Sequence, residues 1–114
     1  LSRARAYVAA GADGIMIHSR RKEPEEIFTF VERFRQADPD TPLVVVPTSF
    51  HAVTEEEFRR LGVNIVIYAN QLMRGQVPAM RRTAESILRH HRALEADEEL
   101  MPFGEIIRMI PDAL

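Results

Sequence analysis

Three short apolar segments, separated by stretches with helical periodicity, constrain the fold of this chain more than any other feature. They are residues 14–17, 43–46 and 63–68, and each is rich in Val, Ile or Leu. Continuous apolar strands of this kind are typical of a parallel sheet that is covered on both faces. Parallel neighbours need a helix-length connection, which is right-handed in nearly every known case. The sequence therefore predicts an α/β fold built from parallel β/α units.

The segments around these strands carry clear helix signals. Pro24 at a first-turn position, with acids around it, starts a helix whose apolar residues 27, 30, 31 and 34 share one face. Thr54 and Glu57 form a capping box for a helix that runs through residue 61 and ends at Gly62. A long helix is predicted from about residue 73 to 91, with Pro78 as its candidate bend.

Composition and the chain ends limit the class of protein. The hydrophobic share of 46% excludes disorder, and the net charge of −2 gives no basic patch for nucleic acid. No apolar run approaches the roughly 18 residues that a membrane span needs, and cysteine is absent, so we expect a cytoplasmic protein without disulfides or thiolate zinc sites. Residues 1–10 resemble a helix already under way, and three parallel strands leave two open edges, so we expect a piece of a longer protein.

Polar residues follow all three predicted strands. His18 and Ser19 come after the first, Thr48 after the second and Asn70 after the third. The carboxyl ends of parallel strands lie on one rim, so these side chains are expected to converge on a candidate site. The alternative is that each is a strand-end polar group whose hydrogen bonds are satisfied by its own loop.

Cationic and histidine side chains give this rim an anion-binding character. His18 can donate to an anionic oxygen from one ring nitrogen while the loop fixes the other; the alternative is a half-buried structural histidine. Arg20, Arg21 and Lys22 would attract an anionic substrate, or they are ordinary solvated surface. Arg74 either points toward the site or pairs with an acid outside it.

Other polar clusters fit structural roles better. His90 and His91 are adjacent on a helix and point about 100° apart, so they cannot chelate one ion together and suit the carboxyl end of the helix. The acids at residues 55–57 lie in the first turn of a helix, where its dipole explains them. Those at 95–99 lack the spacing and glycine of an EF-hand loop. No metal-ligand cluster is predicted in this chain.

The chain resembles the phosphoenolpyruvate mutase and phosphonopyruvate hydrolase group of the isocitrate lyase superfamily. The segments that carry the resemblance are, in order, residues 6–13, 17–20, 44–48, 62–63, 66–70, 72–74 and 105–108. Residues 48–51 are less typical of the group. The resemblance implies a TIM-type (β/α)8 barrel, of which this chain is the carboxyl-terminal half with the last three strands. Residues 1–93 would be the partial barrel, and residues 94–114 an acidic connection and an extra terminal helix.

The resemblance also implies an activity and a site. Its members interconvert phosphoenolpyruvate and phosphonopyruvate, forming the carbon–phosphorus bond of phosphonate biosynthesis. His18 matches the histidine that holds the phosphoryl group, and Ser19, Thr48, Asn70 and Arg74 are the expected substrate-binding residues. Magnesium is implied as the cofactor, with its ligands outside this chain, so the fragment alone should be inactive. Phosphonopyruvate hydrolase, a carbon–carbon lyase and a non-catalytic half-barrel for assembly are the alternatives.

The last predicted helix points to a homo-oligomer. Within residues 103–110, one face carries the apolar side chains of Phe103, Ile106, Ile107 and Ile110. An extended acidic connection over residues 94–99 would carry this helix away from the barrel. The resemblance implies exchange of a terminal helix between subunits, and the alternative is that the helix folds back on its own barrel.

Overall fold

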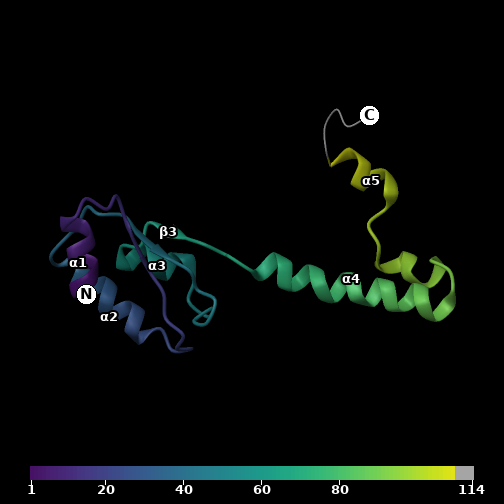
Figure 1. The fold of residues 1–114 in the computed structure, drawn as a ribbon, viewed down its shortest axis with the longest axis horizontal. Coiled ribbons are helices and arrows are strands. Elements are labelled where there is room, and N and C mark those ends of the chain that lie inside the picture. The colour runs from purple at the N-terminus through teal and green to yellow at the C-terminus, as the bar shows by residue number, and fades with distance from the viewer. Residues whose placement is uncertain (110–114) are drawn as a thin grey trace. The chain divides into compact units, whose positions relative to one another are not determined.

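The computed structural model describes residues 1–109, and the chain divides into two compact units, Leu1–Asn70 and Gln71–Leu114 (Figure 1). The elements of the first unit are α1 (Ser2–Ala9), β1 (Ile15–Ile17), α2 (Glu25–Arg35), β2 (Leu43–Val45), α3 (Glu55–Leu61) and β3 (Ile65–Val66). The second unit contains α4 (Gln71–His90), the 3-10 helix η1 (Leu94–Glu99) and α5 (Phe103–Arg108). The predicted domain boundary between residues 93 and 94 stays a prediction.

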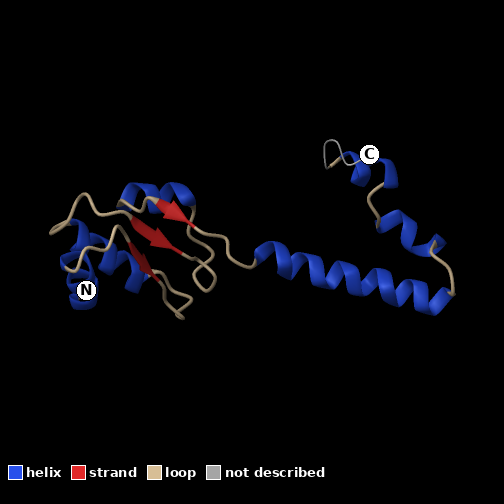
Figure 2. Ribbon diagram, turned by 45° about the horizontal axis from the view of Figure 1, so that its top comes forward, coloured by secondary structure: helices blue, strands red, loops and turns tan. Residues whose placement is uncertain are grey.

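The three strands form one parallel sheet in the order β1-β2-β3, as the spacing of the apolar segments predicted (Figure 2). The third strand is shorter than the expected residues 63–68. The amide of Val63 donates to the carbonyl of Phe58 at 2.9 Å and so completes the end of α3 instead of joining the sheet. At the other end of the sheet, the carbonyl of Val46 accepts bonds from outside the ladder, so β2 stops at Val45.

The sequence signals for helix starts and ends are confirmed for α3 and differ slightly from the structure for α2 and α4. Thr54 caps α3 with both hydrogen bonds of the capping box, and Gly62 ends this helix with a φ of 94°. The hydrogen bonds from the backbone and hydroxyl of Thr54 lower the pKa of Glu57. Pro24 differs from the prediction, because it is the N-cap of α2 and not part of the first turn. α4 contains Pro78, and it ends one residue before the expected His91, whose φ of 54° is left-handed.

Helices cover one face of the sheet. The core joins Ile15 of β1 and Leu43 and Val45 of β2 to the apolar face of α2, and all of these side chains are buried. The opposite face carries an open row, which we define as Met16, Val44 and Ile65, aligned across the three strands. Met16 is 61% exposed and Ile65 48%. Since parallel sheets are normally covered on both faces, the open row needs a partner surface.

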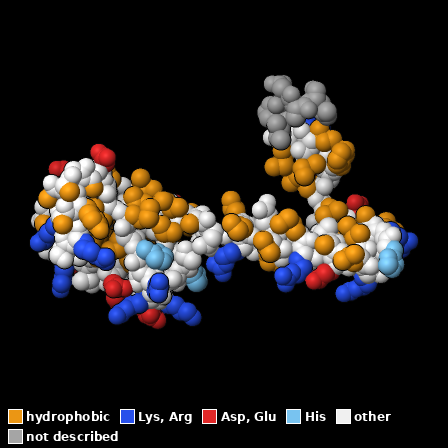
Figure 3. Space-filling model, in the orientation of Figure 1, with side chains coloured by type: hydrophobic (Ala, Val, Ile, Leu, Met, Phe, Trp, Pro, Cys, Tyr) orange, Lys and Arg blue, Asp and Glu red, His pale blue; other side chains and the backbone are white. Residues whose placement is uncertain are grey.

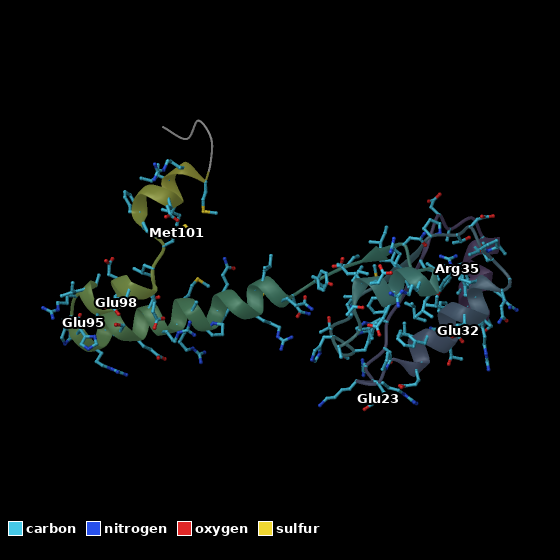
Figure 4. All side chains as sticks on the ribbon, turned by 180° about the vertical axis from the view of Figure 1, so that it is seen from behind. Glu23, Glu32, Arg35, Glu95, Glu98 and Met101 are labelled. Carbon is cyan, nitrogen blue, oxygen red and sulfur yellow. The ribbon has the colours of Figure 1, made fainter. Side chains whose placement is uncertain are left out.

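Arg35 links α2 to the amino-terminal ends of strands β2 and β3 through several hydrogen bonds. The Arg35 guanidinium, at the end of α2, donates to the carbonyls of Gly62 (2.8 and 2.9 Å), Thr41 (2.8 Å) and Asp38 (3.1 Å). It also donates to the side-chain oxygen of Asn64 at 2.7 Å. These acceptors lie just before β2 and β3 (Arg35 is labelled in Figure 4), so this one side chain joins α2 to both strands.

The second unit corrects the expectation of an extended acidic connection. Residues Leu94–Glu99 form η1, whose Ala96 is only 3% exposed. Arg82 of α4 bonds to Glu99 at 3.2 Å, and Arg92 pairs with Glu95. Figure 4 shows Glu95 and Glu98 on η1 beside the end of α4. Some of the acids of the predicted extended connection are therefore used in ion pairs that hold η1 beside the helix before it.

Exposed apolar side chains are the main surface feature of the second unit. No residue of α4 is buried, and Figure 3 shows hydrophobic side chains along it. α5 ends at Arg108, and Phe103 and Ile106 are 77% and 52% exposed. The fourth residue of the predicted stripe, Ile110, lies outside the described residues. Among the helices of residues 1–109, none combines the length and the hydropathy that crossing a membrane requires.

Candidate functional site

The imidazole of His18 is exposed directly after β1, and one of its nitrogens is fixed. Nδ1 lies 3.2 Å from the carbonyl oxygen of Val46. Because a carbonyl only accepts, Nδ1 carries a proton, and Nε2 is the ring nitrogen left for a ligand. The ring lies beside Phe50, with 6.3 Å between centroids, and Phe50 packs edge-on against Phe58 at 6.2 Å. His18 is exposed in this chain, and its role, as a substrate-binding or as a structural histidine, stays a prediction.

Thr48 and Asn70 meet at the same rim. The side-chain amide of Asn70 donates to the hydroxyl of Thr48 at 3.2 Å, and the amide of Thr48 donates to Val46 O at 2.8 Å. The segment after β2 therefore contacts His18 on one side and Asn70 on the other. The structure thus connects these three predicted site residues through hydrogen bonds, while their roles toward a substrate stay predictions.

Ser19 has a different environment. It is 5% exposed, and its hydroxyl donates to a carboxylate oxygen of Glu26 on α2. The hydroxyl oxygen of Ser19 in turn accepts a hydrogen bond from the backbone amide of Arg21 at 3.1 Å. Ser19 therefore matches the alternative in which a strand-end polar group is satisfied by its surroundings. A direct contact between Ser19 and a substrate stays a prediction.

The predicted cationic residues divide between the two units. Arg20, Arg21 and Lys22 are exposed in the loop after β1, and Arg21 is 3.8 Å from Glu26. Such an exposed ion pair contributes little to stability. Arg74 is exposed in α4, which belongs to the second unit, so its contribution to the site stays a prediction.

Sequence reasoning missed the partner of Tyr68. The phenol, in the segment after β3, donates to Glu55 Oε1 at 2.8 Å, and this hydrogen bond raises the pKa of Tyr68. Tyr68 comes two residues before Asn70, so its place after a strand was a usable signal. Its partner was not predictable, because Glu55 was explained by the helix dipole alone.

No residue cluster in the described part of the chain fits a magnesium site. Over residues 1–109 there is no group of three or more His, Cys, Asp or Glu side chains that could hold a metal ion. The predicted magnesium would have to be bound by residues outside this range, and it stays a prediction.

Comparison with known proteins assigns the chain to a family. Residues 1–88 match the family model described as phosphoenolpyruvate phosphomutase. The chain belongs to the phosphoenolpyruvate phosphomutase family. It lies within the group of phosphoenolpyruvate mutases and phosphonopyruvate hydrolases of the isocitrate lyase superfamily, as the resemblance predicted.

Relatives of both activities are similar to the chain. A phosphoenolpyruvate phosphomutase of Tetrahymena pyriformis is 38% identical over 96% of this chain and 35% of its own length. A phosphonopyruvate hydrolase of a Variovorax species is 41% identical over 96% of this chain and 37% of its own length. The chain thus spans about a third of the length of these phosphomutase-family relatives.

Solved structures of the family share the fold. The crystal structure of phosphoenolpyruvate phosphomutase from Streptomyces platensis superposes with a TM-score of 0.86 at 33% identity, covering 94% of this chain and 36% of that one. A phosphonopyruvate hydrolase in complex with oxalate and Mg++ gives 0.81 at 42% identity, with 95% and 38% covered. The predicted fold class is confirmed: the chain contributes parallel β/α units of a TIM-type barrel. In a barrel of this type inward side chains fill the interior, so we expect the open row to face it in the complete protein.

Proposed function

We propose that this chain is part of a longer phosphoenolpyruvate mutase that interconverts phosphoenolpyruvate and phosphonopyruvate. The observation that carries the proposal is the imidazole of His18, whose Nδ1 is held by Val46 O while Nε2 is left for a ligand at the strand ends. A ring fixed in this way can hold one phosphoryl oxygen through Nε2 without first reorienting. Family membership supports the substrate class, because the matching family model and several relatives are named phosphoenolpyruvate phosphomutase.

Transfer of the phosphoryl group depends mainly on electrostatic stabilisation of its charge by the protein, and less on covalent catalysis. The phosphoryl group moves between an oxygen and a carbon of the same three-carbon unit, and charge on it is spread over its outer oxygens. In the proposal, a protonated Nε2 of His18 donates to one of these oxygens, with the Thr48–Asn70 pair beside it. The cations at residues 20–22 raise the local concentration of the anionic substrate. Residues 1–109 contain no cluster of side chains that could bind magnesium, and the proposed role of His18 does not depend on the metal.

Phosphorus NMR of phosphonopyruvate incubated with the complete protein tests this function. We expect phosphoenolpyruvate to appear, because a mutase moves the phosphoryl group without releasing it. Free phosphate would instead establish the second candidate, phosphonopyruvate hydrolase, which is favoured by the 41% identity to the Variovorax enzyme. If neither product forms, a carbon–carbon lyase or a non-catalytic assembly module replaces both. The 114-residue chain alone is the negative control and should give no turnover.

We also propose that the complete protein is a homo-oligomer in which α5 packs on a neighbouring subunit. The support is the exposure of Phe103 and Ile106, since burying each such side chain is worth about 1.5–3 kcal/mol. The double change Phe103→Asp plus Ile107→Asp is expected to convert the oligomer to monomer or aggregate, measured by light scattering. Glu105→Gln is the matched control and should leave the mass unchanged. An unaltered mass in the double variant would show that α5 folds back on its own barrel or takes no part.

A further inference from the structure

The buried hydroxyl of Ser19 connects two elements that border the candidate site. Its oxygen donates to Glu26 on α2 and accepts from the amide of Arg21, two residues further along the loop. Ser19 is only 5% exposed, so these protein contacts use its donor and one acceptor position away from solvent. A hydroxyl has one donor, so while it is bonded to Glu26 it cannot also donate to a substrate oxygen.

Glu26 is placed to hold the loop from α2. It lies in the first turn of this helix, where the dipole favours a carboxylate, and the apolar face of α2 anchors the helix in the core through Ile27 and Val31. One oxygen of Glu26 accepts from Ser19 and also lies 3.8 Å from the guanidinium of Arg21. A helix whose apolar face is anchored in the core therefore holds a short loop through one carboxylate on its exposed side.

We propose that Glu26 and Ser19 form a positioning pair that sets the loop of residues 18–22, and thereby the imidazole of His18 and the cations at residues 20–22. Neither side chain needs to touch the substrate. This inference rests on the proposed function, because it assigns the pair to the site at which a phosphoryl-bearing substrate binds. It replaces direct substrate binding as the role of Ser19.

A double-mutant cycle in the complete protein separates this role from direct contact. Ser19→Ala and Glu26→Ala are each expected to lower kcat/KM for phosphonopyruvate by about ten-fold, mostly through KM, because misplacing a binding loop is costly. Since each change breaks the same link, the double variant should also lose about ten-fold. A loss of kcat/KM near 100-fold in the double variant would mean that Ser19 acts on the substrate independently of Glu26. That result would overturn the proposal.

Matched variants distinguish positioning from general stability. Glu25→Gln removes a neighbouring first-turn acid from α2 and should leave KM unchanged. Glu26→Gln keeps an oxygen that can accept from Ser19, so it should restore KM to within about two-fold of the wild type. If Glu26→Gln is as impaired as Glu26→Ala, or if all variants lose thermal stability at unchanged KM, the positioning role is wrong.

Hydrogen exchange gives a readout that does not depend on activity. The amide of Arg21 is bonded to Ser19, so Glu26→Ala should speed exchange in the peptide spanning residues 18–24 by about ten-fold or more, while Glu25→Gln should not. If amide hydrogen exchange in this peptide is unchanged in Glu26→Ala, the proposed positioning pair is wrong. If the wild-type protein processes no phosphonopyruvate yet this exchange difference is present, the proposed function fails while the structural link holds.

Discussion

Replacing His18 with Ala in the complete protein is expected to lower the turnover of phosphonopyruvate by about 100-fold or more. This is the scale on which removal of one preorganised donor to a charged transition state acts. The donor in question is Nε2, because Nδ1 is bonded to Val46 O at 3.2 Å. Steady-state kinetics followed by phosphorus NMR measures the effect directly.

Two further substitutions locate the effect on one ring nitrogen. An asparagine at position 18 can keep a donor near Val46 O but has no group at the place of Nε2, so His18→Asn should be as impaired as His18→Ala. His51→Ala is the matched control, because this exposed histidine lies in the loop after β2 and has no part in the proposed site. Wild-type rates in His18→Ala would remove this residue from the mechanism.

Replacing Arg35 with Met should reduce the free energy of unfolding by about 3 kcal/mol, the second large effect we expect. Methionine keeps much of the aliphatic stem but leaves the carbonyls of Gly62, Thr41 and Asp38 and the side chain of Asn64 without their charged donor. Hydrogen bonds to a charged group are worth about 1.5–3 kcal/mol, and the carbonyls that lose Arg35 are part-buried. Denaturant unfolding of the complete protein measures the change.

The control for this substitution lies on the same helix. Arg33 is exposed on α2, and within residues 1–109 it has no ion pair or side-chain hydrogen bond, so Arg33→Met should change stability by less than about 0.5 kcal/mol. Below the unfolding transition Arg35→Met should retain its KM, because Arg35 binds where the strands begin and the site lies where they end. Equal stability of the Arg35 and Arg33 variants would contradict the fastening role.

Local patterns predicted most elements of the fold. The apolar run of residues 43–46, the capping box at Thr54 and the left-handed Gly62 depend on neighbours in sequence, and each has the predicted structure at its centre. Strand ends were less predictable, because they depend on where backbone groups find other partners. Val63 shows this, since its amide bonds to Phe58 and shortens β3.

Contacts between distant residues account for what the sequence did not predict. The rim residues His18, Thr48 and Asn70 were predicted because parallel topology alone brings strand ends together. The hydrogen bonds of Arg35 to Gly62 and of Ser19 to Glu26 join residues on different elements. Their partners are brought together only by tertiary packing. Periodicity contains no information on such pairs. The fold of η1 along α4 was missed for the same reason.

The carbonyl of Val46 also determines how protons can move at the rim. Its oxygen accepts from His18 Nδ1 and from the amide of Thr48, so both of its lone pairs are used within the protein. A proton that enters or leaves the imidazole must therefore do so at Nε2. The ring cannot act as a relay that takes up a proton on one side and releases it on the other. Such a one-sided imidazole suits a step in which a phosphoryl group changes its place and the ring keeps its proton.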